Sequence, residues 1–236
     1  LYNVKASVKE TPTAAWTAKG TDAGEYPVGV KAEDFENTNK NFDNVEFVIV
    51  DGALKIDPVA TKVTVTVTEK SGNATYDGTE HTVTGYESIT ADNTLYNVKA
   101  SVKETPTAAW TAKGTDAGEY PVGIEAKDFK NINENFTNVE FKIVDGVLKI
   151  DPVATKVTVT VTEKSDTVTY DGQAHSVHGY ATMSSNNALY NVNIASNVAA
   201  QETAAWTATG TDAGEYPVGV KAEDFENTNK NFDNVE

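Results

Sequence analysis

The sequence contains no cysteine and only one methionine among its 236 residues. The lack of cysteine excludes disulfides, thiolate metal sites and cysteine nucleophiles together. No run of about 18 apolar residues occurs, and no charged segment followed by an apolar one, so the sequence predicts neither a transmembrane span nor a signal peptide in this segment.

Positive charge is also scarce, because 19 basic residues stand against 35 acidic ones and give a net charge of −16. A chain this acidic repels nucleic acid and anionic membranes, so neither is expected as a partner. We expect the acidity to keep β-rich modules soluble and to oppose pairing between their edges.

What the sequence does contain is repetition with a period of about 94 residues. Residues 1–29 recur unchanged at 95–123, and a looser third copy starts at Leu189 with two extra residues before Trp206. This period fits one small β-domain and is too long for one turn of a solenoid. The segment IDPVATK marks the boundaries between copies, because proline disfavours a continuing sheet. The predicted units are a partial one at 1–60, a complete one at 61–154 and one lacking its last hairpin at 155–236.

Each copy alternates apolar and polar residues with a period of two, which indicates strands. Val63, Val65 and Val67 are expected on one face of a strand, with threonines on the other. Further strands are predicted at 81–86, 95–102, 108–112, 118–126, 139–144 and 147–150, with hairpin turns at the Asp-Gly pairs 51–52, 77–78 and 145–146. Residues 127–138 are the only stretch with room for a helical turn. This pattern predicts an all-β protein made of tandem immunoglobulin-like β-sandwiches in an extended array.

The motif Asp-Ala-Gly-Glu-Tyr resembles the tyrosine corner of immunoglobulin-like domains, with a valine where those domains carry a cysteine. The predicted corner residues are Asp22, Tyr26, Asp116, Tyr120, Asp212 and Tyr216. Together with TYDG at 75–78 and 169–172 and the closing Gly-x-Leu-x-Ile at 146–150, the unit resembles the MBG/YDG-type repeats of large bacterial surface proteins. The resemblance implies immunoglobulin-like repeats in secreted or wall-attached adhesins, without a known ligand, catalytic residue or cofactor.

The residues that could support catalysis or metal binding are better explained by structural roles. His175 and His178 are three apart on a predicted strand and therefore point to opposite faces, which prevents easy chelation of one ion. Asp116 and Glu119 recur in every copy, but their positions indicate turn capping and solvent exposure. Residues 37–44 place oxygen side chains at alternate positions as a calcium loop does, but a lysine lies inside and the tight-turn glycine is missing. We therefore predict no catalytic, metal or cofactor site.

Two further sets of residues leave alternatives open. Trp16, Trp110 and Trp206 could serve as sugar-stacking platforms, although one large core anchor in each small sandwich is the favoured interpretation. Lys62 and Asn138 are the best pair for an intramolecular isopeptide bond, which would require both side chains to be buried beside a protonated acid.

These features predict a non-enzymatic stalk or spacer in an extracellular bacterial surface protein. Charges change sign between 30–40 and 124–134, which predicts an exposed face and argues against a charged ligand there. One alternative is multivalent binding of a host glycan or glycoprotein. Another is a self-assembling fibre, in which a strand from a neighbouring chain fills the groove of an incomplete unit.

Overall fold

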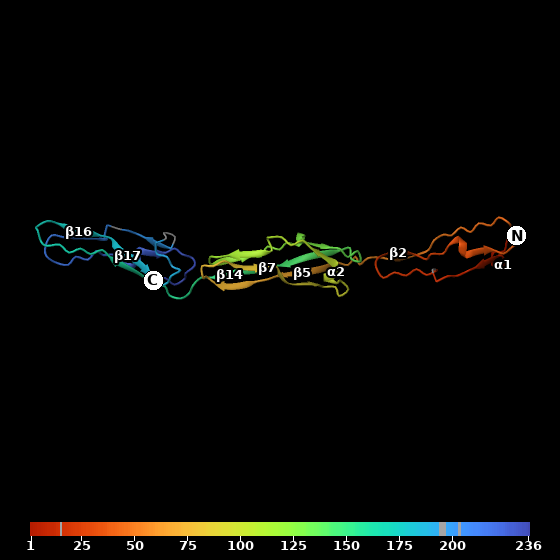
Figure 1. The fold of residues 1–236 in the computed structure, drawn as a ribbon, viewed down its shortest axis with the longest axis horizontal. Coiled ribbons are helices and arrows are strands. Elements are labelled where there is room, and N and C mark those ends of the chain that lie inside the picture. Colours follow the sequence, from red (N-terminus) through yellow and green to blue (C-terminus); the bar gives the residue numbers. More distant parts are fainter. Residues whose placement is uncertain (15, 194–196, 203) are drawn as a thin grey trace. The chain divides into compact units, whose positions relative to one another are not determined.

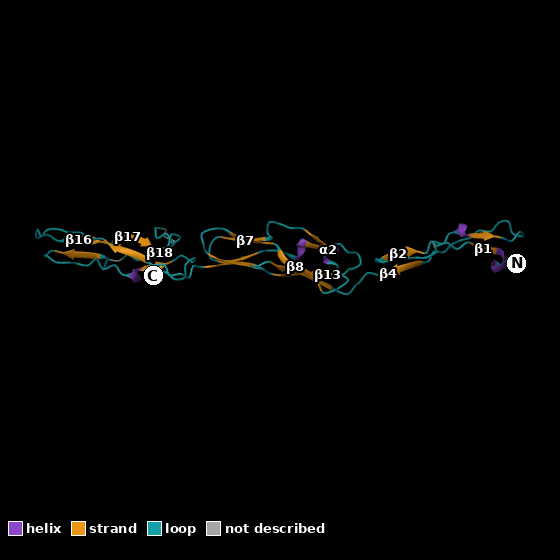
Figure 2. Ribbon diagram, turned by 60° about the horizontal axis from the view of Figure 1, so that its bottom comes forward, coloured by secondary structure: helices purple, strands orange, loops and turns teal. Residues whose placement is uncertain are grey.

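The computed structural model describes residues 1–14, 16–193, 197–202 and 204–236 (Figure 1). Strands and loops make up nearly all of it, and the helices are single turns (Figure 2). These turns are the α-helices α1 (Val4–Ser7) and α2 (Val98–Ser101) and the 3₁₀ helices η1 (Ala32–Asp34), η2 (Ala126–Asp128) and η3 (Ala222–Asp224). The all-β prediction is confirmed. Within the described residues, no helix is long and apolar enough to cross a membrane.

The strands follow the three sequence copies. The first copy holds β1 (Val8–Glu10), β2 (Gly24–Pro27), β3 (Phe35–Asn37) and β4 (Ala53–Ile56). The middle copy holds β5 (Val63–Glu69), β6 (Gly72–Thr75), β7 (His81–Thr84), β8 (Tyr86–Ala91), β9 (Val102–Glu104), β10 (Thr111–Gly114), β11 (Gly118–Pro121), β12 (Phe129–Asn131), β13 (Val139–Val144) and β14 (Val147–Asp151). The third copy holds β15 (Val159–Glu163), β16 (His175–His178), β17 (Tyr180–Ser185), β18 (Val198–Ala200), β19 (Thr207–Gly210) and β20 (Phe225–Asn227).

Strand β5 is the central strand of a three-stranded sheet with the order β13-β5-β8. Its three valines, Val63, Val65 and Val67, are fully buried, whereas the threonines between them are partly exposed. This alternation follows from the two-residue period of a strand with one face against the core. Tyr96 and Phe136 complete the cluster around the first two valines, so the predicted apolar face of β5 is the core of the middle copy.

A second three-stranded sheet of the middle copy has the order β11-β14-β6. Strand β11 pairs antiparallel with β14, which sets Tyr120 opposite Leu148. Strand β6 pairs parallel with β14, which sets Ala74 opposite Ile150. Two further antiparallel pairs, β10 with β7 and β12 with β9, complete the pairing in this copy. Because β11 lies in this sheet, the turn just before it is held close to the end of the copy.

The predicted Asp-Gly hairpins are wrong. Strands β13 and β14 flank Asp145-Gly146 but belong to different sheets, and β6 and β7 around Asp77-Gly78 are likewise unpaired with each other. A two-residue hairpin turn needs a positive φ at its first central residue, and no described non-glycine residue has one. Gly146 serves packing instead, because a Cβ there would overlap the backbone of Lys70.

Two predicted strands also need correction. Residues 95–102 form the one-turn helix α2 and only then enter β9, because the Asn97 carbonyl accepts hydrogen bonds from the Ala100 and Ser101 amides. The strand predicted at 118–126 ends at Pro121, and the helical turn expected at 127–138 begins at Ala126 as η2. The two extra residues of the third copy fall in a segment of which 194–196 and 203 lie outside the described residues.

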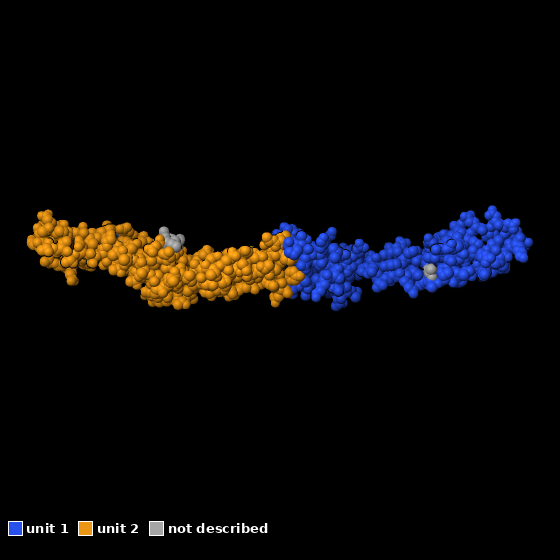
Figure 3. Space-filling view, in the orientation of Figure 1, with its two compact units in different colours: residues 1–67, 88–106, 125–143 blue, residues 68–87, 107–124, 144–236 orange. Residues whose placement is uncertain are grey.

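The chain divides into two compact units (Figure 3). The first unit comprises residues 1–67, 88–106 and 125–143, and the second comprises 68–87, 107–124 and 144–236. Each unit contains one junction between consecutive sequence copies, near residue 60 in the first and near residue 154 in the second. The candidate site is built at these two junctions.

Candidate functional site: the joints between sequence copies

The tyrosine of the Asp-Ala-Gly-Glu-Tyr motif fixes the turn that carries it. The Tyr120 hydroxyl donates a hydrogen bond to the backbone carbonyl of Asp116 over 2.8 Å. A Cβ at residue 114 would overlap the Tyr120 ring, so Gly114 lets the ring lie flat against the backbone. The same hydroxyl-to-carbonyl bond joins Tyr26 to Asp22 over 2.8 Å and Tyr216 to Asp212 over 3.2 Å. These bonds lie at exposed positions, so their effect is chiefly to set the shape of the turn.

That turn contacts the following sequence copy through one asparagine. The Ala117 N–H donates to Asn231 Oδ1 over 2.6 Å. Asn231 Nδ2 in turn donates to the Asp116 carboxylate over 2.9 Å. The asparagine amide thus uses both of its ends on the same turn, which fixes its orientation. Asn231 and Ala117 are both buried, where such bonds are stronger and less easily replaced by water.

The junction between the first and middle copies repeats this arrangement. The Ala23 N–H donates to Asn135 Oδ1 over 2.5 Å, and Asn135 Nδ2 donates to the Asp22 carboxylate over 2.8 Å. These residues correspond one for one to those of the later junction. The arrangement therefore belongs to the repeated sequence and is not an accident of one junction.

The linker backbone joins the same loop at both junctions. The Val153 N–H donates to the Asn231 carbonyl over 2.8 Å, and the Asp233 N–H donates back to the Val153 carbonyl over 3.2 Å. Val59 makes the same two backbone bonds, accepting from Thr137 and donating to Asn135. A short parallel β-bridge therefore lies just after each Ile-Asp-Pro segment.

An aromatic pair closes the later junction. Phe232 is 2% exposed and packs edge-on against Tyr190 of its own copy, with ring centroids 5.0 Å apart. It also packs edge-on against Tyr76, from the TYDG motif of the middle copy, over 5.6 Å. This edge-to-face geometry is favourable for aromatic rings beyond the area it buries. Tyr76 of the first TYDG motif therefore packs against the next copy.

We call this arrangement the inter-copy joint. It consists of an Asp-Ala turn, a linker valine and an Asn-Phe pair of the following copy. Its residues are Asp22, Ala23, Val59, Asn135 and Phe136 at the first junction, and Asp116, Ala117, Val153, Asn231 and Phe232 at the second, where Tyr76 is added.

The alternating asparagines preorganise the loop that carries the Asn-Phe pair. Asn227 Oδ1 accepts from the Asn229 N–H over 3.0 Å, and Asn229 Oδ1 accepts from the Asn231 N–H over 2.9 Å. Asn227 Nδ2 also donates to the Phe232 carbonyl over 2.9 Å. Each asparagine thus forms an Asx-type turn with the residue two positions on. The oxygens that a calcium loop would need are committed to backbone N–H groups, which accounts for the alternation.

The tryptophans lie in the core in two of the three copies. Trp206 is 1% exposed, and Trp110 is also buried. The Trp206 ring stacks on Phe225 with centroids 5.5 Å apart, and its indole N–H donates to Asp224 over 2.7 Å. A ring covered on its face cannot stack on a sugar. Trp110 and Trp206 therefore lie where the core-anchor interpretation places them.

Trp16 makes the same indole hydrogen bond in the first copy, to Asp34 over 2.7 Å. The Lys31 backbone N–H and then the Trp16 indole N–H hold the pKa of Asp34 below its usual value, because both donate to the ionised carboxylate. Trp16 is only partly buried. Its ring stacks on Phe35 with centroids 5.6 Å apart, as Trp206 does on Phe225.

The histidines have separate local partners. His175 Nε2 lies 3.0 Å from Asp171 in the TYDG motif, whereas His178 lies 2.8 Å from Thr207 and 2.6 Å from Glu202. Hydrogen bonds from the Gln173 backbone and then from His175 lower the pKa of Asp171. Within the described ranges, no group of three or more histidine, aspartate or glutamate side chains is placed to hold a metal ion.

The residues considered for an isopeptide bond are not placed together in a buried site. Lys62 forms an ion pair with Glu140, and both side chains are more than half exposed. Asn138 is also exposed and donates to the Ala60 carbonyl over 3.3 Å. An amide bond between the lysine and the asparagine would need the burial that this exposed arrangement lacks.

The positions at which charge changes sign between copies are exposed, as predicted. Lys31 forms an ion pair with Glu33 in the first copy, and the reversed pair Glu125 and Lys127 does so in the middle copy. Both copies therefore keep the ion pair, but its two charges change places. A charged ligand would meet a different electrostatic field in each copy.

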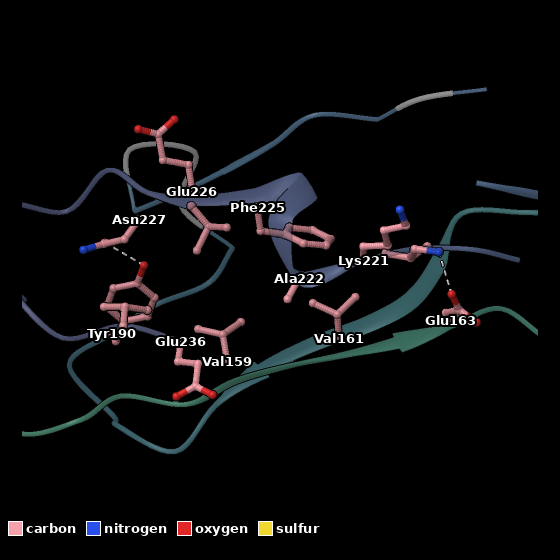
Figure 4. A pocket seen from close by; sticks show the side chains of 13 residues that line it. Val159, Val161, Glu163, Tyr190, Lys221, Ala222, Phe225, Glu226, Asn227 and Glu236 are labelled. Atoms are coloured by element: carbon pink, nitrogen blue, oxygen red, sulfur yellow. Dashed lines mark hydrogen bonds between the residues drawn. The ribbon is translucent and has the colours of Figure 1, made fainter. Parts of the chain in front are cut away.

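A cavity of about 400 Å³ lies in the third copy, with Val159, Val161 and Phe225 directed into it (Figure 4). In the middle copy, Phe141 of β13 stacks on Phe129, the counterpart of Phe225, with centroids 5.7 Å apart. The cavity of the third copy thus lies beside Phe225, on the residue whose counterpart in the middle copy is covered by Phe141.

The glutamate that ends β5 is a functional group that the sequence analysis missed. Glu69 is 3% exposed, and its two carboxylate oxygens accept from the Ile124 N–H over 2.5 Å and the Gly146 N–H over 2.7 Å. Its counterpart Glu163 accepts from the Val220 N–H over 2.7 Å. The signal in the sequence was a glutamate at the same position of two copies, directly after the valine-threonine strand.

Residues 62–152 match the family model for the MBG domain. The matched stretch is the middle copy from Lys62 to Pro152. The match confirms the resemblance that the repeated motifs indicated. Comparison with curated proteins found no match, and comparison with solved structures found none either.

Proposed function

We propose that the chain is a structural spacer, made of immunoglobulin-like β-sandwiches in tandem, within an extracellular bacterial surface protein. In this role it extends or presents an adhesive region and catalyses no reaction. The observation that carries the proposal is the inter-copy joint, which uses the same residues and the same bonds at both junctions.

A joint of this kind limits bending between neighbouring copies. The asparagine amide ties the end of one copy to the loop of the next by two hydrogen bonds, and the linker valine adds two backbone bonds. A reorientation of the copies would break these contacts together and expose the phenylalanine of the joint. Short linkers also restrict the angles open to the chain. Regular spacing between copies is a property that a stalk needs and a single binding site does not.

The test is the distribution of distances across each joint in the full chain. Spin labels on the exposed side chains of Lys113 and Lys221, measured by pulsed electron resonance, report on the second junction. We expect a narrow distribution in the unaltered chain and a broader one after Asn231→Ala. Asn44→Ala, at an exposed asparagine with no hydrogen bond in the described structure, is the matched control and should change nothing. Equally broad distributions in all three chains would refute the spacer.

A binding function is separated from a spacer function by exposing the full chain to an array of host glycans and glycoproteins. Saturable binding would show that the chain is an adhesive repeat and not only a spacer. The buried Trp110 and Trp206 would then be poor first targets for substitution, and the exposed charged positions would be better ones.

A further inference from the structure

The first and last strands of the middle copy are each the central strand of a three-stranded sheet. Strand β5 begins directly after the IDPVATK segment at 56–62 and lies between β13 and β8. Strand β14 ends within the next such segment, at 150–156, and lies between β11 and β6. Tension on the chain would pull β5 toward its amino end and β14 toward its carboxyl end. Each strand would then have to slide past two neighbours before the copy could unfold.

The parallel pairing of β6 with β14 places their hydrogen bonds in shear under such tension. Strand β6 follows β5 closely in the chain, and its register sets Gly72 opposite Leu148 and Thr75 opposite Asp151. Because the two strands run in the same direction, tension on the chain pulls them in opposite directions along their shared axis. The evenly spaced bonds of a parallel pair then bear the tension together. Leu148 and Ile150 of β14 are buried, which keeps water away from these bonds.

Further hydrogen bonds extend this pair at both of its ends. At the start of β14, the Val147 N–H donates to Ser71 Oγ over 3.2 Å. At the other end, the Tyr76 N–H donates to the Asp151 carbonyl over 2.8 Å, and Asn73 Nδ2 donates to the Asp151 carboxylate over 3.1 Å. The segment from Ser71 to Tyr76 is therefore bonded to β14 along the whole length of that strand.

The buried glutamate at the end of β5 joins the first strand of the copy to the last. Glu69 is 3% exposed, and its carboxylate accepts from the N–H of Gly146, the residue directly before β14, over 2.7 Å. The same carboxylate accepts from the Ile124 N–H over 2.5 Å, and the third copy repeats this bond between Glu163 and the Val220 N–H. Hydrogen bonds to a carboxylate are stronger than those between neutral groups. Displacing β14 from β5 therefore requires this bond to break.

We propose that the middle copy is built to bear tension, and that Glu69 and the β6–β14 pair form a mechanical clamp that keeps it folded under pull. The clamp resists because its hydrogen bonds must break together before either end of the copy can extend. This inference rests on the proposed spacer function, since a spacer that presents an adhesive region transmits any pull on that region. The clamp adds that the spacer keeps its length while it is pulled.

The first experiment compares two directions of pulling on the full chain at constant force. The chain has no native cysteine, so a pair of introduced cysteines fixes the two points of attachment. Thr61→Cys with Thr155→Cys, both at exposed positions, loads the middle copy along its own chain and shears the clamp. Thr75→Cys with Thr155→Cys pulls β6 and β14 apart from the end that they share, so their bonds break one after another. At the same force, we expect unfolding to be about tenfold or more slower in the first geometry.

The second experiment measures variants in the shearing geometry. Glu69→Gln weakens one of the two bonds of that side chain and should raise the unfolding rate about tenfold. Asn73→Ala, at an exposed position, should raise it about threefold and provides the test if Glu69→Gln does not fold. Tyr96→Phe is the control, because it removes hydroxyl bonds to Ser101 and Asn131 outside the clamp. Those bonds are still intact when the clamp breaks, so their loss lowers stability but should leave the forced unfolding rate nearly unchanged.

Two outcomes would overturn the clamp. One is the same unfolding rate in both pulling geometries. The other is a rate that rises as much in Tyr96→Phe as in the clamp variants, which would mean that resistance to force only follows overall stability. Either outcome, together with narrow distance distributions across the joints, would remove the clamp and leave the spacer function in place. Broad distributions in a chain with a strong clamp would instead refute the spacer and leave the clamp as a property of the copy.

Discussion

Replacing Glu69 by alanine should destabilise the middle copy more than any surface substitution. Its carboxylate is the acceptor for two backbone N–H groups, those of Ile124 and Gly146, which belong to different segments of the same unit. Gly146 precedes β14 directly, and Ile124 follows β11. The side chain therefore holds both ends of the β11–β14 pair against the end of β5.

The expected loss of stability follows from the two backbone N–H donors that would lose their acceptor. A buried N–H that loses its acceptor costs about 1–3 kcal/mol, and hydrogen bonds to charged groups lie at the upper end of this range. Two such donors give about 3–5 kcal/mol, unless water enters. Glu69→Gln should cost less, because one amide oxygen still accepts while the NH₂ group meets the second donor.

The third copy supplies a matched control. Glu163 occupies the same position but accepts from a single amide, that of Val220, and it is only partly buried. Glu163→Ala should therefore cost about half as much or less, roughly 1–2 kcal/mol. The two substitutions remove the same side chain, so their difference isolates the second hydrogen bond and the deeper burial.

Hydrogen exchange followed by mass spectrometry of the full chain can measure both losses. Peptides covering residues 124–134 and 146–152 report on the middle copy, and their sequences differ from the other copies. In Glu69→Ala these peptides should lose protection, whereas peptides of the third copy should keep it. Equal losses for Glu69→Ala and Glu163→Ala, or a loss below about 1 kcal/mol for Glu69→Ala, would refute the reasoning.

Three smaller effects complete the set. Tyr120→Phe should cost about 0.5 kcal/mol in urea unfolding, because its hydroxyl bond is exposed, and a loss above about 2 kcal/mol would mean that the bond is shielded from water. Lys130→Glu should stabilise the β9–β12 pair by about 0.3 kcal/mol, since Lys130 faces Lys103 across the strands, and the reverse sign would contradict the register. Because the pKa of Asp34 is lowered, its contribution to stability is full above the unfolded pKa of about 3.9. This contribution is lost as the pH falls through the lower folded value. The NMR signal of the Trp16 indole N–H should therefore shift in acid, and it should not titrate in Asp34→Asn.

Patterns within a few residues of sequence predicted those parts of the fold that neighbouring residues decide, such as the buried face of a strand. The valine-threonine alternation placed the buried face of β5 correctly, because a two-residue period and one apolar face suffice to define a strand. The Asp-Gly pairs misled, because a hairpin also requires the flanking strands to pair with each other. That choice is made by the whole copy, in which Glu69 binds the Gly146 amide and β14 pairs with β11 and β6. No short window of sequence contains this information.

The inter-copy joint could not be predicted from the sequence of one copy, because two consecutive copies each supply half of it. The alternating asparagines were visible, and their resemblance to calcium ligands was the nearest chemical interpretation. Their oxygens are in fact used by backbone N–H groups, and only the last asparagine turns outward to the neighbouring copy. Residues 20–46 and 210–236 make the same point: one sequence leaves Phe42 exposed and Phe232 buried. The two stretches differ in whether a neighbouring copy lies against them. It follows that invariant exposed residues of a tandem array should be assigned to the contact between copies before they are assigned to a ligand.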